Sequence, residues 1–149
     1  MSLLNYSTTV PAHRTAQQIQ NVLVKHGAKS ILSEYGDDGA LTALAFQVET
    51  RCGLVSIRLP VAPEPVLQVL EKQWERGQVP RRYVNQEQAV KVAWRIVKDW
   101  VEAQMAILET EMVRMEQIFL PYVVTPGGQT VFEVIEQKQF RIGEGKGEA

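Results

Sequence analysis

The clearest pattern in the chain is a strict alternation of apolar with small or polar side chains over residues 42–49. Leu44, Phe46 and Val48 share one side of the pattern, whereas Gln47 lies on the other. Successive side chains of a strand point to opposite faces of a sheet. The alternation therefore predicts a strand with one buried face.

Two further strands are expected beside this one. Residues 30–35 precede the dipeptide Asp38-Gly39, which favours the positive φ angles of a tight hairpin. Apolar and polar side chains alternate again over 55–59, and Pro60 ends that run because proline cannot donate to a sheet ladder. The three segments together predict an antiparallel meander with one buried face.

Apolar residues at helical spacing predict a helix on each side of the meander. The first should begin at Thr15, a residue type that caps helices, and end at Gly27. The second should begin at Pro63, because a first-turn proline loses no intrahelical bond, and end at Gly77. The segment 3–10, before the first helix, is predicted to be extended.

The longest helical pattern begins at Asn85, a good N-cap, and carries an apolar stripe from Val90 to Met115. The stripe repeats close to every 3.5 residues, with Gln104 as its one polar interruption. We expect a break near Thr110, because an unbroken helix would exceed the usual globular length. The stripe should first cover the chain's own sheet, and pairing with a second copy is its expected second use.

The C-terminal part gives weaker signals. Residues 130–135 form an apolar run too short for its period to separate strand from helix, so both remain open. Residues 143–149 hold no apolar side chain able to anchor them, which predicts a disordered tail. The predicted fold is a single α+β domain over 1–142, a three- to four-stranded antiparallel meander with one face covered by helices, including one long helix in the second half.

Composition excludes several classes of protein. With 149 residues, 45% of them hydrophobic and 22% charged, the chain fits one globular domain. No apolar stretch is long enough for a membrane span and no signal peptide is recognisable, so we expect a cytoplasmic protein without a membrane partner. Cys52 is the single cysteine and cannot form an internal disulfide. With only His13 and His26 beside it, neither a metal site nor a cofactor is expected.

The overall charge balance hides an uneven distribution. The chain has 16 Lys and Arg against 17 Asp and Glu, a net charge of −1. Residues 76–98 contain six basic residues and only Glu87 as an acidic one, a net +5 that leaves −6 for the rest. This basic stretch is the strongest candidate for contact with an anionic partner.

The candidate binding residues lie in this stretch. Lys91, Arg95 and Lys98 share one helix face, and aromatic side chains between the charges offer a platform for a base. The alternative is a solvated helix face with internal ion pairs, such as Lys98 with Glu102 and Arg95 with Asp99. The full candidate set is Arg76, Arg81, Arg82, Tyr83, Lys91, Trp94, Arg95 and Lys98.

Other chemical signals are weak. Trp94 and Trp100 lie about 120° apart around a helix, which predicts packing on two sides. His13 and His26 are expected at the surface, and Cys52 has no base tied to it. No phosphate-binding loop, dinucleotide fingerprint or hydrolase motif is present, so catalysis is not expected.

The order helix, three antiparallel strands, helix over 15–74 resembles the α-β-β-β-α arrangement of double-stranded-RNA-binding domains and of the homologous-pairing domain of recombination annealing proteins. The resemblance concerns topology alone. Those domains have a lysine cluster at the start of the second helix, where this chain has Ala62-Pro63-Glu64-Pro65.

A second resemblance covers the segment 93–105 and the tetrapeptide Phe119-Leu120-Pro121-Tyr122. Both are similar to a recurrent pattern in small uncharacterised proteins of bacteriophages and prophages. The resemblance implies a phage accessory role, in the host cytoplasm, in nucleic-acid metabolism or against a host defence signal.

The leading functional prediction is non-catalytic binding of single-stranded nucleic acid through the basic surface. One alternative is an oligomeric binder of a small nucleotide-like ligand, in which the same arginines hold phosphate. The other is a purely structural or partner-binding protein. A homo-oligomer is expected in any of these cases.

Overall fold

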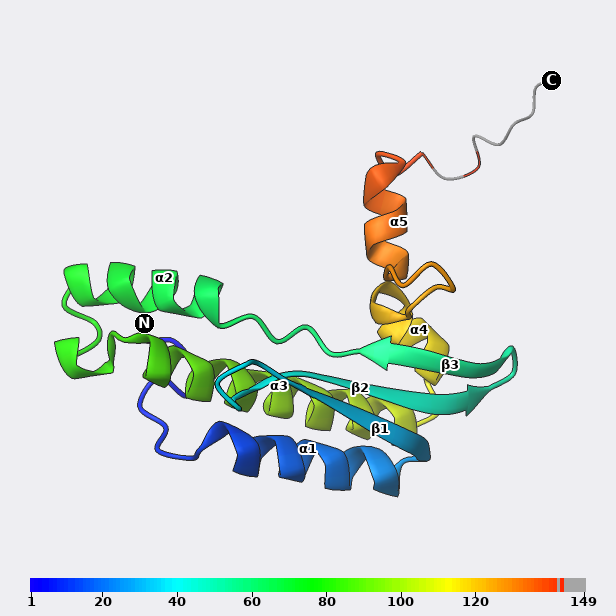
Figure 1. Cartoon of the computed structure of the whole chain (residues 1–149), viewed down its shortest axis with the longest axis horizontal. Helices are drawn as coiled ribbons and strands as arrows, with labels where there is room; N and C mark the ends of the chain where they lie inside the picture. Colours follow the sequence, from blue (N-terminus) through cyan, green and yellow to red (C-terminus); the bar gives the residue numbers. More distant parts are fainter. Residues whose placement is uncertain (142, 144–149) are drawn as a thin grey trace.

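The computed structural model describes residues 1–141 and 143, and it confirms the α+β fold. The predicted tail over 143–149 lies outside the described residues, apart from Gly143. No helix within the described part is long and apolar enough to cross a membrane. In chain order the elements are α1 (Ala12–Lys25), β1 (Ala28–Tyr35), β2 (Leu41–Thr50), β3 (Gly53–Arg58), α2 (Pro63–Glu75), the 3-10 helix η1 (Arg81–Tyr83), α3 (Gln86–Glu109), α4 (Met115–Phe119), the 3-10 helix η2 (Leu120–Tyr122) and α5 (Val131–Gln137) (Figure 1).

The sheet is the predicted antiparallel meander, with β2 between β1 and β3. Ile31 of β1, Phe46 of β2 and Ile57 of β3 are directly opposite one another in the register. Opposite residues of an antiparallel pair point to the same face. These three side chains therefore belong to the covered face of the sheet, as the alternation in β2 predicted.

A short segment extends the sheet beyond β3. Val123 forms an isolated antiparallel bridge with Ile57, and the Val124 N–H donates to the Ser56 carbonyl at 2.8 Å. Val124 in turn bridges Thr130, so the chain folds back on itself before α5. The outer edge of β3 is thus partly covered by the chain itself.

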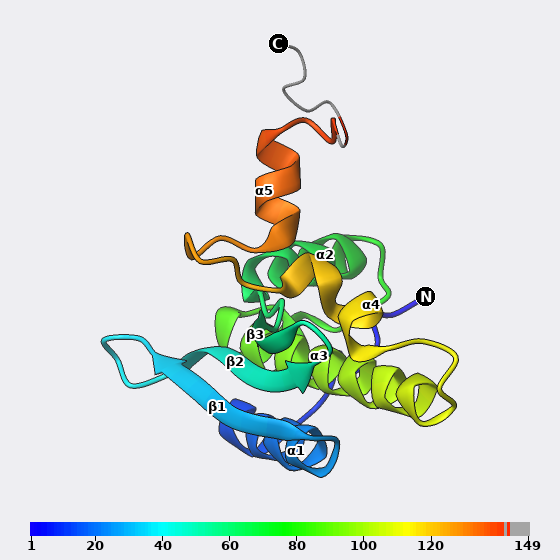
Figure 2. The ribbon, with the colours of Figure 1, turned by 90° about the vertical axis from the view of Figure 1, so that its right-hand side faces the viewer.

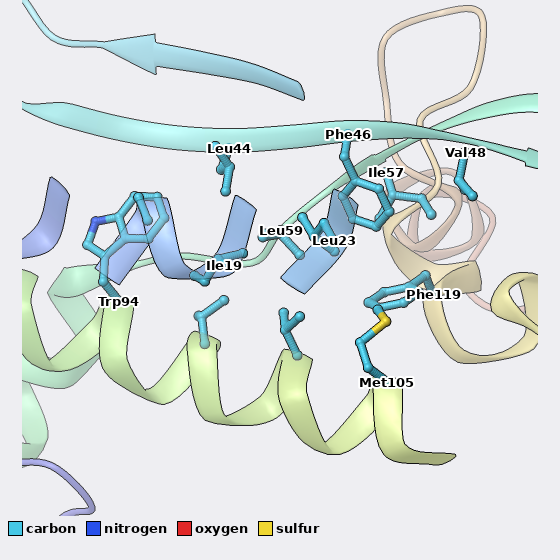
Figure 3. Close-up of a cluster of buried hydrophobic side chains, with 13 residues drawn as sticks. Ile19, Leu23, Leu44, Phe46, Val48, Ile57, Leu59, Trp94, Met105 and Phe119 are labelled. Atoms are coloured by element: carbon cyan, nitrogen blue, oxygen red, sulfur yellow. The ribbon is translucent and has the colours of Figure 1, made fainter. Parts of the chain in front are cut away.

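Helices α1 and α3 cover one face of the sheet and bury its apolar side chains (Figures 2 and 3). Phe46 lies at the centre of this core and is 2% exposed. It packs edge to face against Phe119, with ring centroids 5.7 Å apart. The predicted stripe of α3 therefore serves first to cover the chain's own sheet. The core residues are Ala16, Ile19, Leu23, Leu44, Phe46, Val48, Ile57, Leu59, Trp94, Val97, Val101, Met105 and Phe119.

The two tryptophans of α3 pack on different sides, as their spacing predicted. Trp94 is 1% exposed and lies in the core beneath the sheet (Figure 3). Trp100 packs edge to face against both Phe119 and Tyr122, with centroid separations of 5.5 Å. The second tryptophan therefore fastens α4 and η2 to α3.

Helix α2 packs against α3 rather than joining the helical layer on the sheet (Figure 1). Leu70 of α2, Val79 of the following loop and Ala89 of α3 are each no more than 2% exposed and form a second apolar cluster. A residue without a large side chain, Ala89, lets the two helices approach closely. The first turns of α3 thus pack against both α2 and the loop that follows α2.

Both ends of α3 follow the sequence prediction. The Asn85 side chain accepts a hydrogen bond from the Gln88 N–H at 2.8 Å, so it is the N-cap. The helix ends at Glu109, and Glu111 adopts a φ of 61° two residues later. A residue with positive φ cannot continue a right-handed helix, which explains the break near Thr110.

Two predictions about the first 15 residues are wrong. The segment 3–10 is a turn rather than a strand, with Asn5 at a φ of 65° and the Tyr6 N–H bonded to the Leu3 carbonyl at 3.1 Å. Helix α1 begins at Ala12 and not at Thr15. Pro11 is extended and its carbonyl accepts the first helical bonds, which leaves Thr15 buried inside the helix.

The open element over 130–135 is a helix. The Thr130 side chain accepts from the Glu133 N–H at 3.2 Å, and the Glu133 carboxylate accepts from the Thr130 N–H at 2.8 Å. This reciprocal capping box satisfies two backbone donors at the start of α5. The helix stands away from the rest of the fold (Figure 1).

A core substitution tests the packing of the sheet on its helices. We expect Leu44→Ala to lower the free energy of unfolding by about 2–5 kcal/mol, because a fully buried leucine leaves a cavity. Leu54→Ala is the matched control, since Leu54 is 52% exposed on the other face of the sheet. The control should change stability by less than about 0.5 kcal/mol in urea unfolding. Equal effects of the two substitutions would contradict this packing.

The cap of α5 should depend on pH. The hydrogen bond from the Thr130 N–H lowers the pKa of Glu133 below its ordinary value. A depressed pKa in the folded state means that the cap contributes at neutral pH and is lost as the pH falls through that pKa. We expect the Thr130 amide resonance to shift with this titration in NMR spectra, and to stop following it in Glu133→Gln. A pH-independent Thr130 amide in the wild type would exclude the cap.

Candidate functional site

The exposed basic residues gather where α2 ends and η1 begins. Arg76 is the C-cap of α2, and the chain then turns at Gly77, which has a φ of 74°. Arg81 and Arg82 form the first two residues of η1 and are exposed, as Arg76 is. We call these three residues the arginine cluster. Val79, buried between them, anchors the loop in the second apolar cluster.

Two of the three guanidinium groups lie on aromatic rings. The Arg81 Cζ atom is 4.6 Å from the ring centroid of Trp74, and the Arg82 Cζ atom is 4.7 Å from that of Tyr83. Arg82 Nη2 also donates to the Tyr83 hydroxyl at 3.3 Å. A guanidinium stacked on a ring is held in one plane, while its N–H edge stays available to an oxygen acceptor such as phosphate.

Residues 1–8, before α1, pack against Tyr83 and bond to Gln88. Tyr6 packs edge to face against Tyr83, with ring centroids 5.4 Å apart. The Gln88 side chain donates to the Tyr6 carbonyl at 2.8 Å and to the Thr8 carbonyl at 3.0 Å. Gln88 is 9% exposed, so these bonds satisfy an amide that would otherwise be buried without partners. The segment thereby fixes the ring on which Arg82 stacks.

A second set of bonds ties the same segment to α2. Gln73 accepts from the Leu3 N–H at 2.8 Å and donates to the Met1 carbonyl at 3.2 Å. The Ser2 hydroxyl donates to the Gln78 carbonyl at 2.9 Å. The segment is therefore a strap across α2, the loop and α3, which the prediction of an extended segment missed.

The basic residues further along α3 serve the fold instead. Arg95 Nη1 donates to Gln18 Oε1 of α1 at 2.7 Å, so it joins two helices. The alternative interpretation predicted an ion pair between Arg95 and Asp99, and the structure does not contain it. Asp99 instead accepts a hydrogen bond from Asn5 Nδ2 at 2.8 Å.

Lys98 forms the predicted pair with Glu102, at 2.8 Å between Nζ and Oε1. Lys91 is half-buried on the same helix. The candidate set thus divides into an exposed arginine cluster and a partly buried face of α3.

Among the described residues, no carboxylate lies within ion-pair distance of the arginine cluster. Glu75 and Glu87 are exposed in the neighbouring helices but do not pair with it. The internal ion pair that the alternative interpretation expected is present at Lys98 and absent, among the described residues, at the arginine cluster. Most other Lys and Arg side chains of the described residues also lack a carboxylate partner, so the distinguishing features of the cluster are its density of charge and the rings beneath two of its members.

Trp94 is not available to a ligand. Its side chain is 1% exposed within the core, so no base can stack on it. Trp74 takes that place at the surface, since it is 42% exposed and lies under Arg81. The signal in the sequence was its position in the last turn of α2, directly before the basic loop. The helical spacing of Leu70 and Trp74 alone does not separate a core position from a surface position.

The uncovered face of the sheet carries a separate shallow groove of about 450 Å³. Gln47 lies at its centre, accepting from Ser30 Oγ at 2.8 Å and donating to Ser56 Oγ at 3.1 Å. These bonds form a polar line across all three strands. The three side chains satisfy one another, whereas the charged Glu34 and Arg58, which also line the groove, form no ion pair among the described residues.

The candidates for catalysis do not come together. His26 Nε2 lies 3.1 Å from Glu109 Oε1, a contact that joins the ends of α1 and α3. Cys52 is exposed in the turn between β2 and β3, and His13 is exposed on α1. Within residues 1–141 and 143, no three His, Cys, Asp or Glu side chains are placed to hold a metal ion.

No family model, curated protein or solved structure matches this chain. The two resemblances drawn from the sequence, and the phage role that one of them implies, therefore stay predictions.

The exposure of Trp74 can be measured by fluorescence. We expect Trp74→Phe to reduce the acrylamide quenching more than Trp94→Phe does, because Trp74 is 42% exposed, Trp94 is 1% exposed and Trp100 is partly buried. Trp94→Phe is the control and should leave the quenched fraction unchanged if the variant stays folded by circular dichroism. Quenching that Trp74→Phe reduces no more than Trp94→Phe would place the accessible ring elsewhere.

Proposed function

We propose that this chain binds single-stranded nucleic acid, without catalysis, through the arginine cluster and the two rings that support it. The observation that carries the proposal is the stacking of Arg81 on Trp74 and of Arg82 on Tyr83, beside a third exposed arginine, Arg76. Phosphate oxygens are the acceptors that a guanidinium binds in a planar, two-pronged geometry. The cluster supplies such donors at a spacing of a few residues along one exposed loop.

The aromatic rings favour a single strand over a duplex. Bases of a single strand are unstacked and accept an aromatic ring or a guanidinium plane as a stacking partner. Arg81 stacks on Trp74 and Arg82 stacks on Tyr83, so each charged group of η1 lies beside a flat apolar ring. In a duplex the bases are already stacked, and only the phosphate contacts would remain.

The remaining candidate residues act indirectly in this proposal. Arg95 joins α3 to α1 through Gln18, and Lys98 pairs with Glu102 one turn further along α3, so both side chains are engaged within the fold. The strap supports Tyr83 through Tyr6. A ligand would therefore meet a preformed surface, with little side-chain ordering left to be done on binding.

The salt dependence of binding is the direct test. We expect the anisotropy of a labelled oligothymidine to report binding at low ionic strength, with a log–log salt slope of about −2 for three phosphate contacts. Arg81→Ala and Arg82→Ala should each weaken binding and reduce the slope by about 0.7. Arg51→Ala is the matched control, because Arg51 is exposed in the turn at the other end of the fold (Figure 1).

Four outcomes would contradict the proposal. Binding that is absent at low ionic strength, or weakened as much by Arg51→Ala as by Arg81→Ala, would exclude this surface. A mononucleotide that strongly raises the melting temperature at saturation would instead support the small-ligand alternative. A duplex bound as tightly as the single strand would remove the role of Trp74 and Tyr83 in stacking.

A further inference from the structure

The two edges of the sheet are treated differently by the fold. The β3 edge is covered by Val123 and Val124, through the Ile57 bridge and the Val124 bond to Ser56. The β1 edge pairs with no other strand among the described residues, because β1 is the terminal strand of the sheet (Figure 2). A bare edge presents backbone donors and acceptors that another strand can pair with.

We propose that β1 pairs antiparallel with β1 of a second copy of this chain, giving a continuous six-stranded sheet. This pairing goes beyond the proposed nucleic-acid binding and does not depend on it. Each copy has one unpaired β1 edge, and a single pairing between two copies covers both of these edges. The two outer edges of the resulting sheet are the β3 edges, each partly covered by Val123 and Val124.

Symmetry restricts the register. A two-fold axis that makes neighbouring strands antiparallel stands perpendicular to the sheet, so the helices of both copies lie on the same side. Residues that oppose each other must then come from the same face of β1. The register centred on Leu32 meets this condition, because it places Leu32 against Leu32 of the second copy on the uncovered face. Leu32 is 59% exposed in the single chain, an apolar side chain that this contact would cover.

Charge supports the antiparallel direction. Lys29 lies near the start of β1 and Glu34 near its end, and both are exposed. In the register centred on Leu32, Glu34 opposes Ser30 of the second copy and lies one position from its Lys29, just outside the regular segment of residues 30–34, so the ends of the two strands carry opposite charges. Parallel pairing would instead bring like charges together.

The ends of β1 limit the length of the pairing. Register shifts occur between Ala28 and Ser30 and between Glu34 and Tyr35. Such irregularities twist an edge away from a neighbouring strand and are a common protection against open-ended aggregation. The regular part, residues 30–34, is therefore the segment that the second copy contacts.

A charge at the centre of the contact tests the pairing. In sedimentation velocity across a concentration series, we expect the wild type to dimerise and Leu32→Lys to raise the dimer Kd by about tenfold or more, because two ammonium groups would face each other. Leu54→Lys is the matched control, since Leu54 is similarly exposed at 52% on β3. It should leave the Kd unchanged.

A cross-link tests the register without relying on stability. Opposite Cα atoms of antiparallel strands lie about 4.5–5.5 Å apart, within the range of about 4.4–6.8 Å that a disulfide spans. In a Cys52→Ser background, which removes the exposed native thiol, Leu32→Cys should form a covalent dimer on mild oxidation, whereas Leu54→Cys should not.

A wild type that stays monomeric at every concentration would overturn the proposal. So would a dimer that Leu32→Lys leaves intact, or one that cross-links through Leu54→Cys rather than Leu32→Cys. Circular dichroism of each variant separates loss of pairing from loss of folding.

Discussion

One apolar face of a small sheet must be covered, and α3 is the element that makes the cover possible. Its side chains at Trp94, Val101 and Met105 lie against the sheet together with those of α1. A sheet that is hydrophobic on one face must bury that face against another element, so the sheet and these helices form one packed unit. Everything else in the fold is placed relative to α3.

The arginine cluster follows from the same constraint. The sheet side of α3 is occupied by the core, so α2 packs against its first turns through Leu70 and Ala89. The loop between α2 and α3 is then held at one end of the molecule by Val79, with its arginines exposed. The position of the surface is a consequence of helix packing, whereas its chemistry comes from the rings and charges along that loop.

Local signals in the sequence were sufficient for much of this fold. The alternation around Phe46 identified β2, and Asn85 identified the start of α3, because each depends on near neighbours in the chain. The start of α1 was misplaced because Pro11 can supply the first helical acceptor with no side-chain cap. The helical period also could not say which of Trp74 and Trp94 would be covered, since that depends on what packs against each helix.

The prediction of an extended segment over residues 3–10 failed for a different reason. The strap is held by contacts with residues far away in the sequence, and such contacts affect the order in which the protein folds. Ser2, Leu3 and Asn5 bind partners that lie 76, 70 and 94 residues further along the chain. Contacts between such distant residues form late, after the loop between them has been closed by other structure. During synthesis residues 2–5 must wait until α3 has followed them. The strap is therefore among the last parts of the fold to form.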